Sequence, residues 1–206
     1  NSAVIWVSSL GAGLGATNNT LKNLNLTAGE IGSTTSIQTF GIHVSGTALT
    51  NSGTGADNDN LTIQNNLIKK ARYGIYARAT AVANANDNLQ ILNNTIGSAI
   101  TSEYVTFRGI DLTYAEAPVV SGNTIFNLKT TLGATNAGID CGAGVNNGVV
   151  AKNNISGIYC ESTSGYGAYG INFSSTTSVN NNLISNNIIS DIRTVNYAFG
   201  TTYNAY

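Results

Sequence analysis

Two stretches of this sequence, "NLTIQNNLI" at 60–68 and "NLQILNNTI" at 88–96, repeat almost the same phrase. With the second asparagine of "NN" as an anchor, the phrase recurs along the chain, and its anchors are Asn66, Asn94, Asn123, Asn153 and Asn187, with a weaker copy at Leu24. Successive anchors are separated by 42, 28, 29, 30 and 34 residues. A phrase that returns at such intervals indicates a repeat architecture, in which each copy is one structural unit stacked on the next.

Apolar residues occupy the same places in every copy of the phrase. Three residues before the anchor stand Leu21, Ile63, Ile91, Val120, Val150 and Ile184. Two residues after it stand Leu26, Ile68, Ile96, Ile125, Ile155 and Ile189. The position just before the anchor is mixed in character, so we expect it to face solvent or to lie in a turn.

A second phrase, glycine followed by isoleucine, accompanies the first at 41, 74, 109, 138 and 170. After this glycine the apolar residues alternate, as in Ile110 and Leu112 or Ile139 and Cys141, and a period of two residues is that of a β-strand. Each repeat therefore supplies at least two short strands joined by turns rich in Gly, Asn, Ser and Thr. We expect Ile91, Ile125 and Ile139 to be almost fully buried.

The same strand returning in the same register favours identical strands stacked in parallel, about 4.8 Å apart. Each anchor asparagine then lies above the next. We expect these side chains to point inward and to form a hydrogen-bonded ladder, with the anchors themselves in the left-handed conformation at a tight bend.

This "N-x-I-x-N-N-x-I…G-I" pattern resembles the right-handed parallel β-helix repeats of the pectin-lyase-like superfamily, from Val4 to about Tyr203. The resemblance implies an all-β, right-handed, single-stranded parallel β-helix, a solenoid of about six coils of roughly 28–42 residues over residues 1–206. The loose, Asn/Thr-rich style is most similar to repeat regions of large secreted bacterial cell-surface and adhesin proteins. That superfamily includes both enzymes and adhesins, so the resemblance implies a fold rather than a function.

Composition narrows the class of partner. Only 9% of the residues are charged and the net charge is −1, so we expect no nucleic-acid partner. No apolar run approaches the ~20 residues that span a bilayer, so we expect no membrane insertion. The chain enters directly into "AVIWV" and leaves in "FGTTYNAY". Because neither segment resembles a cap, we expect flanking coils or copies of the chain to stack on the ends.

The position after the isoleucine of the second phrase is expected to point outward, and its members are Trp6, His43, Tyr76, Asp111, Asp140 and Asn172. Rings that stack on sugar faces, followed by carboxylates that accept hydroxyl hydrogen bonds, would suit a glycan-binding strip. The alternative is a plain exposed wall.

Asp111 and Asp140 are expected about 5 Å apart if their strands are in register, close to the separation used by retaining glycosidases. Like charges so close should raise one pKa or recruit a cation. They are the catalytic candidates if the chain is a polysaccharide lyase or glycoside hydrolase. No arginine or lysine shares their column, so a catalytic set is incomplete.

Two further groups of residues are candidates for special chemistry. Asp57, Asp59 and Asp87 lie in Gly/Asn-rich turns at the entry to adjacent coils, where Ca²⁺ binding and local turn formation are both possible roles. Cys141 continues the inward column of Leu112, which predicts a small core residue. Whether it forms a disulfide with Cys160 stays open.

The regular core without an assembled active site favours a non-enzymatic structural or adhesive segment of an extracellular bacterial surface protein or filament, with contact to polysaccharide as an additional role. The alternative is the polysaccharide-processing enzyme at Asp111 and Asp140.

Overall fold

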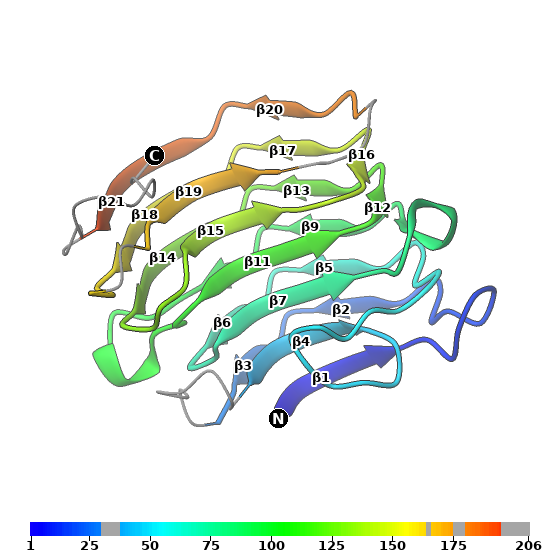
Figure 1. Ribbon diagram of the computed structural model, residues 1–206, viewed down its shortest axis with the longest axis horizontal. Coiled ribbons are helices and arrows are strands. Elements are labelled where there is room, and N and C mark those ends of the chain that lie inside the picture. Colours follow the sequence, from blue (N-terminus) through cyan, green and yellow to red (C-terminus); the bar gives the residue numbers. More distant parts are fainter. Residues whose placement is uncertain (30–37, 164–165, 175–179, 195–206) are drawn as a thin grey trace.

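The apolar columns of the sequence stack into three parallel walls. The computed structural model describes residues 1–29, 38–163, 166–174 and 180–194. Within them the chain winds as an all-β parallel solenoid of about five turns, close to the six coils expected (Figure 1). The closing segment "FGTTYNAY" at 199–206 lies outside the described residues.

Each wall is a six-stranded parallel sheet. Wall A consists of β1 (Ser2–Ser8), β4 (Thr39–Ser45), β7 (Tyr73–Arg78), β11 (Arg108–Thr113), β15 (Asn136–Cys141) and β19 (Ala168–Phe173). Wall B consists of β2 (Thr20–Lys22), β5 (Thr62–Gln64), β9 (Gln90–Leu92), β13 (Val119–Ser121), β17 (Val149–Ala151) and β20 (Leu183–Ser185). Wall C consists of β3 (Asn25–Thr27), β6 (Leu67–Lys69), β10 (Thr95–Ile96), β14 (Thr124–Thr130), β18 (Asn154–Cys160) and β21 (Ile188–Thr194).

Short elements form the corners. A three-stranded sheet of β8 (Asn86–Asp87), β12 (Ala115–Glu116) and β16 (Val145–Asn146) connects walls A and B. Two 3₁₀ turns, η1 (Val82–Asn84) and η2 (Thr101–Glu103), are the helical elements of the described residues. None of the helices described is long and apolar enough to cross a membrane.

The register is the one that the repeat predicts. Ile91 pairs with Ile63 and Val120 in wall B, and Ile96 pairs with Ile68 and Ile125 in wall C. The burial prediction is confirmed, because Ile91, Ile125 and Ile139 expose none of their surface. Like residues stacked on like residues therefore fill one continuous apolar core.

The glycine of the second phrase allows walls A and C to approach closely. A Cβ atom added to Gly109 would lie 2.8 Å from Ile125 Cγ2, and one added to Gly74 would lie 2.7 Å from Ile96 Cγ2. Both distances are too short for carbon atoms, so any side chain at these glycines would displace the facing isoleucine. The two phrases recur together because the isoleucine of the first packs against the glycine of the second.

The asparagine ladder is confirmed. Asn94 Nδ2 donates to Asn123 Oδ1 at 3.0 Å, and Asn123 Nδ2 donates to Asn153 Oδ1 at 3.0 Å. The same oxygens accept backbone N–H groups, and Asn123 Nδ2 also donates to the carbonyl of Ile91 at 2.9 Å. The ladder continues from Asn66 to Asn187, and at the weaker copy the backbone N–H of Leu24 donates to Asn66 Oδ1.

The predicted backbone of the anchors is wrong. The left-handed residues are those one position earlier, with φ of 54° at Asn65 and Asn93, 69° at Gly122 and 58° at Lys152. The anchor side chain must turn inward to satisfy backbone groups, so the preceding residue makes the bend. This turn explains why that position is mixed in the sequence: Asn and Gly tolerate positive φ, and a lysine there can extend into water.

Asn123→Ala is expected to lower the free energy of unfolding by about 1–3 kcal/mol, because it leaves the buried backbone N–H and side-chain amide of Asn94 without their acceptor and removes the side-chain donor to the carbonyl of Ile91. Urea denaturation followed by circular dichroism measures the loss. The control Asn93→Gly keeps the positive φ at an exposed neighbour and should change stability by only a few tenths of a kcal/mol. Equal effects of the two substitutions would contradict the structural role of the ladder.

Candidate functional site

The outer column of wall A is in register but is not an exposed wall. Trp6, His43, Tyr76, Asp111, Asp140 and Asn172 pair with one another in that order. His43 and Tyr76 are completely buried, Asp111 is 1% exposed and Asp140 is 8% exposed. Only Trp6, which is 43% exposed, and the half-buried Asn172 offer surface to a partner. The outward direction was predicted correctly, but the exposure was not.

The loop of residues 46–55 covers this part of wall A. His43 Nε2 donates to the carbonyl of Thr50 at 3.1 Å, and the Tyr76 hydroxyl donates to the carbonyl of Gly53 at 2.8 Å. Because a carbonyl only accepts, Nε2 carries the proton, and Nδ1 accepts from the Ser45 hydroxyl at 2.9 Å. In Figure 1 this segment follows β4 and folds back in front of β1 and β4.

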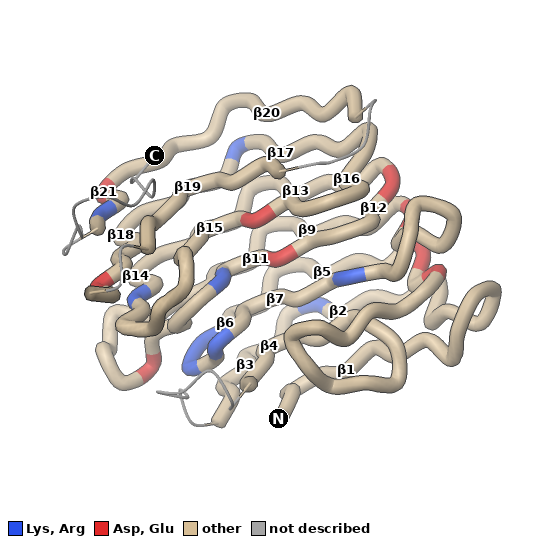
Figure 2. Tube along the Cα trace, in the orientation of Figure 1, with Lys and Arg blue, Asp and Glu red and all other residues tan. Residues whose placement is uncertain are grey.

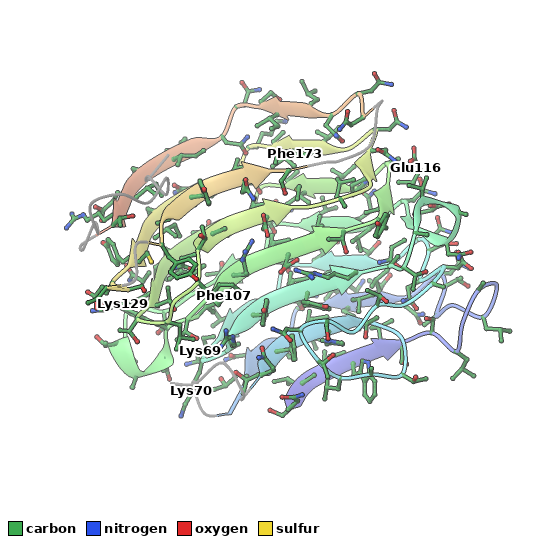
Figure 3. All side chains as sticks on the ribbon, in the orientation of Figure 1. Lys69, Lys70, Phe107, Glu116, Lys129 and Phe173 are labelled. Atoms are coloured by element: carbon green, nitrogen blue, oxygen red, sulfur yellow. The ribbon has the colours of Figure 1, made fainter. Side chains whose placement is uncertain are left out.

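The rings beneath the loop pack on one another. His43 stacks on Tyr76 with centroids 4.6 Å apart, and Phe40 stacks on Tyr73 at 5.1 Å. Phe107 meets Tyr73 edge to face and lies over the outer side of wall A in Figure 3. Faces that are already covered by other rings cannot stack on a sugar, so the glycan strip predicted for this column is reduced to its two ends.

The carboxylates of the column are paired with arginines. Asp111 accepts from Arg78 Nε at 2.9 Å and from Nη2 at 2.8 Å. Asp140 forms an ion pair with Arg108 and accepts a hydrogen bond from Asn172 Nδ2 at 2.6 Å. Figure 2 shows the basic and acidic positions following one another across β7, β11 and β15. The cation expected beside these two carboxylates is therefore an arginine of the chain itself, Arg78 for Asp111 and Arg108 for Asp140.

Sequence reasoning missed these arginines because neither belongs to the column. Arg78 lies two positions beyond Tyr76 on the neighbouring strand, and Arg108 stands three positions before Asp111, so strict alternation along the strand does not place its side chain on the outer face where it meets Asp140. Asp111 and Asp140 do face each other in register, as predicted. Carboxylates bound in this way are arranged as fixed counter-ions, whereas glycosidase chemistry needs one carboxyl group that can hold a proton and reach a substrate.

Burial shifts the pKa values of the ring side chains on the outer face of wall A. It raises the pKa of Tyr73 and of Tyr76, and the nearby charge of Asp111 raises both further. It lowers the pKa of His43, with the hydrogen bond to Thr50 opposing the shift in part. His43 is therefore neutral in the folded chain at neutral pH.

Acidification is expected to destabilise the protein through His43. Its pKa in the folded state is below the ordinary value of 6.5, so the unfolded state binds more protons as the pH falls through 6.5, and stability drops by up to about 1.4 kcal/mol per pH unit. Urea midpoints between pH 7.5 and pH 5 measure this slope. The variant His43→Gln should show a flatter profile in that window, and an identical slope in the variant would exclude His43 as its source.

Two of the three predicted calcium residues, Asp57 and Asp59, accept backbone N–H groups with their carboxylates. Asp59 Oδ1 accepts from the N–H of Asp87 at 2.9 Å, and Asp57 accepts from the N–H of Gly13. Partial burial and the charges of Asp59, Glu116 and Asp57 raise the pKa of Asp87. Across the described residues, no three or more His, Cys, Asp or Glu side chains converge in a way that would hold a metal. Calcium binding stays a prediction.

Both cysteines are free and buried, so no disulfide joins them in this structure. Cys141 is aligned with Leu112 and Phe173 in wall A, as predicted for a core residue. Burial raises the pKa of its thiol to about 12, which leaves it unreactive at neutral pH.

The structure shows a second site that sequence reasoning missed. On the outer face of wall C a groove of about 340 Å³ is lined by Thr101, Tyr104, Lys129, Tyr159, Glu161 and Arg193. Its signal in the sequence is weak. Each of three outward residues follows an inward apolar residue directly: Lys129 follows Leu128, Tyr159 follows Ile158 and Arg193 follows Ile192. This pattern is confined to the last three described coils.

Comparisons with protein-family models, curated proteins and solved structures found no match for this chain. The class that the geometry defines is a parallel β-solenoid.

Proposed function

We propose that this chain is a non-enzymatic structural and adhesive segment of an extracellular bacterial surface protein or filament. In this proposal its solenoid is extended end to end by flanking coils or by copies of itself. The similarity of the repeat to those of the pectin-lyase-like superfamily, and its charge-poor style, typical of large surface proteins, support the location. The geometry of wall A supports the absence of catalysis, because Asp111 and Asp140 are paired with arginines, while His43 and Tyr76 lie beneath a loop.

The observation that carries the proposal is the apolar surface exposed by the last described coil. Ile184 and Ile189 are 49% and 45% exposed, although they continue columns whose preceding members, Val150 and Ile155, are 3% and 0% exposed. In the described part of the chain β20 and β21 end their sheets and pair on one side only. An apolar cross-section with free strand edges favours a further strand in the same register.

Sedimentation velocity over rising concentration, with electron microscopy, tests the proposal on the 206-residue chain. We expect rods that lengthen by about 4.8 Å for each added coil. The double substitution Ile184→Lys and Ile189→Lys should disperse them. The control Ile100→Lys, at a 57% exposed position away from the last coil, should not. A dispersed monomer at high concentration would contradict end-to-end extension.

A further inference from the structure

The groove on the outer face of wall C differs from the covered column of wall A because its polar groups are accessible. The side chain of Arg193 is 65% exposed, and those of Lys129 and Glu161 are 37% and 35% exposed. Tyr104 and Tyr159 are half-buried beside them. Lys129 projects from the left-hand edge of the molecule in Figure 3, away from the covered face of wall A.

The groove is built by four successive coils. Val105 bridges to Leu128, so Tyr104 lies in the coil before Lys129. Lys129 pairs with Tyr159, and Tyr159 pairs with Arg193. Ring, cation, ring and cation therefore follow one another along the solenoid axis. A strip of this kind fits a linear ligand that lies parallel to the axis and contacts several coils at once.

The charges of the strip cancel. Lys129 Nζ lies 2.8 Å from a Glu161 oxygen, and Arg193 is paired with Asp191. Asp191 also accepts a hydrogen bond from the Tyr159 hydroxyl, which raises the pKa of that tyrosine. A polyanion would meet both carboxylates and a polycation would meet both basic groups. Donors and acceptors that lie side by side instead suit hydroxyl groups, which need one of each.

The rings supply the remaining contact. Arg193 lies over the Tyr159 ring, 5.4 Å from its centroid, which holds the ring in place at the surface. Tyrosine offers a rigid apolar face with a polar tip, and such residues bind ligands at a low cost in conformational entropy.

We propose that the groove formed by Tyr104, Lys129, Tyr159, Glu161 and Arg193 binds a neutral polysaccharide, which lies along the solenoid axis. Sugar rings pack on Tyr104 and Tyr159, and hydroxyl groups bond to Lys129 and Glu161. This site rests on the adhesive part of the proposed function and gives it a ligand class, but it does not depend on end-to-end extension.

Affinity electrophoresis of the 206-residue chain tests the site in native gels that contain dextran, galactomannan or hydroxyethyl cellulose. We expect at least one of these neutral polymers to retard the protein, with little change when salt is added. Tyr159→Ala should weaken retardation about 10-fold, and Tyr159→Phe, which keeps the ring, should retain most of it. Tyr114→Ala is the matched control, since it removes a half-buried tyrosine at the corner between walls A and B, and Trp6→Ala tests the exposed ring of wall A. Circular dichroism confirms that each variant is folded.

Three outcomes would overturn the proposal. The first is the absence of retardation by all three polymers. The second is loss of retardation in Trp6→Ala but not in Tyr159→Ala, which would place the glycan contact on wall A. The third is retardation only by dextran sulfate or an oligothymidylate and only at low salt, which would make the alternating rings and cations a polyanion site. The sedimentation behaviour of the chain plays no part in this test, so the site and the proposed assembly can fail separately.

Discussion

Ile125→Asp is expected to reduce the free energy of unfolding by about 5 kcal/mol, which approaches the whole stability of many domains. Ile125 has no exposed surface and lies between Ile96 and Ile155 in its column, with Gly109 facing it from wall A. The new carboxylate would have no cation or hydrogen-bond donor in this apolar stack. Because each coil templates the next, the damage should extend to neighbouring strands.

Far-UV circular dichroism during urea denaturation measures the effect. Ile125→Val keeps an apolar, β-branched side chain and should cost only about 1 kcal/mol. Ile100→Asp places the same charge at a 57% exposed position and should change stability by less than about 0.5 kcal/mol. A urea midpoint unchanged by Ile125→Asp would show that the register of wall C is wrong.

Asp111→Ala is expected to cost about 3 kcal/mol, the second-largest effect among these substitutions. The carboxylate is 1% exposed and accepts both hydrogen bonds from Arg78, whose side chain is 26% exposed. Its removal leaves a largely buried guanidinium above the Tyr76 ring without its counter-ion. The expected loss is mainly the cost of that unpaired charge rather than the net contribution of the pair.

Two further variants separate the cost of the unpaired charge from the net contribution of the ion pair. Asp191→Ala removes an aspartate from an exposed Asp–Arg pair, in which Arg193 is 65% exposed, and should cost much less stability than Asp111→Ala. The double variant Arg78→Met and Asp111→Leu should recover much of the stability lost in Asp111→Ala, since it leaves no buried charge. If Asp111→Ala reduced stability as little as Asp191→Ala, the ion pair of Asp111 and Arg78 would have no structural role.

The predictions for His43 and Asn123 rest on the same cost of an unsatisfied buried polar group, with smaller expected losses of stability. His43 is held neutral beneath the loop of residues 46–55, and the amide of Asn123 satisfies two backbone groups that have no access to water. In both cases a buried polar group contributes stability only while its partners and its protonation state are kept.

Much of the fold was predictable from the sequence because a solenoid repeats one local environment. The columns through Ile91 and Ile125 and the inward ladder through Asn123 depend on periodicity alone, since an identical residue in each coil must meet its own copies. The partner of each strand is then its equivalent in the next repeat. The buried position of Cys141 was predicted for the same reason.

The candidate sites depend on what does not repeat. The loop of residues 46–55 occurs once, and it converts the outer column at His43 and Tyr76 from surface into interior. The arginines that neutralise Asp111 and Asp140 come from outside the column, and strict alternation does not place Arg108 on the face of its partner. The groove of wall C likewise combines Tyr104, from an irregular segment, with three strand positions.

The sequence by itself thus determined the parallel stacking, the strand register and the identity of the core, because these follow from interactions between equivalent positions of successive coils. Only the tertiary structure decided which outward residues are covered, which carboxylates are neutralised and where an accessible groove remains. Those properties depend on the path of the irregular loops and on side chains that reach across columns, and neither is encoded in the period of the repeat.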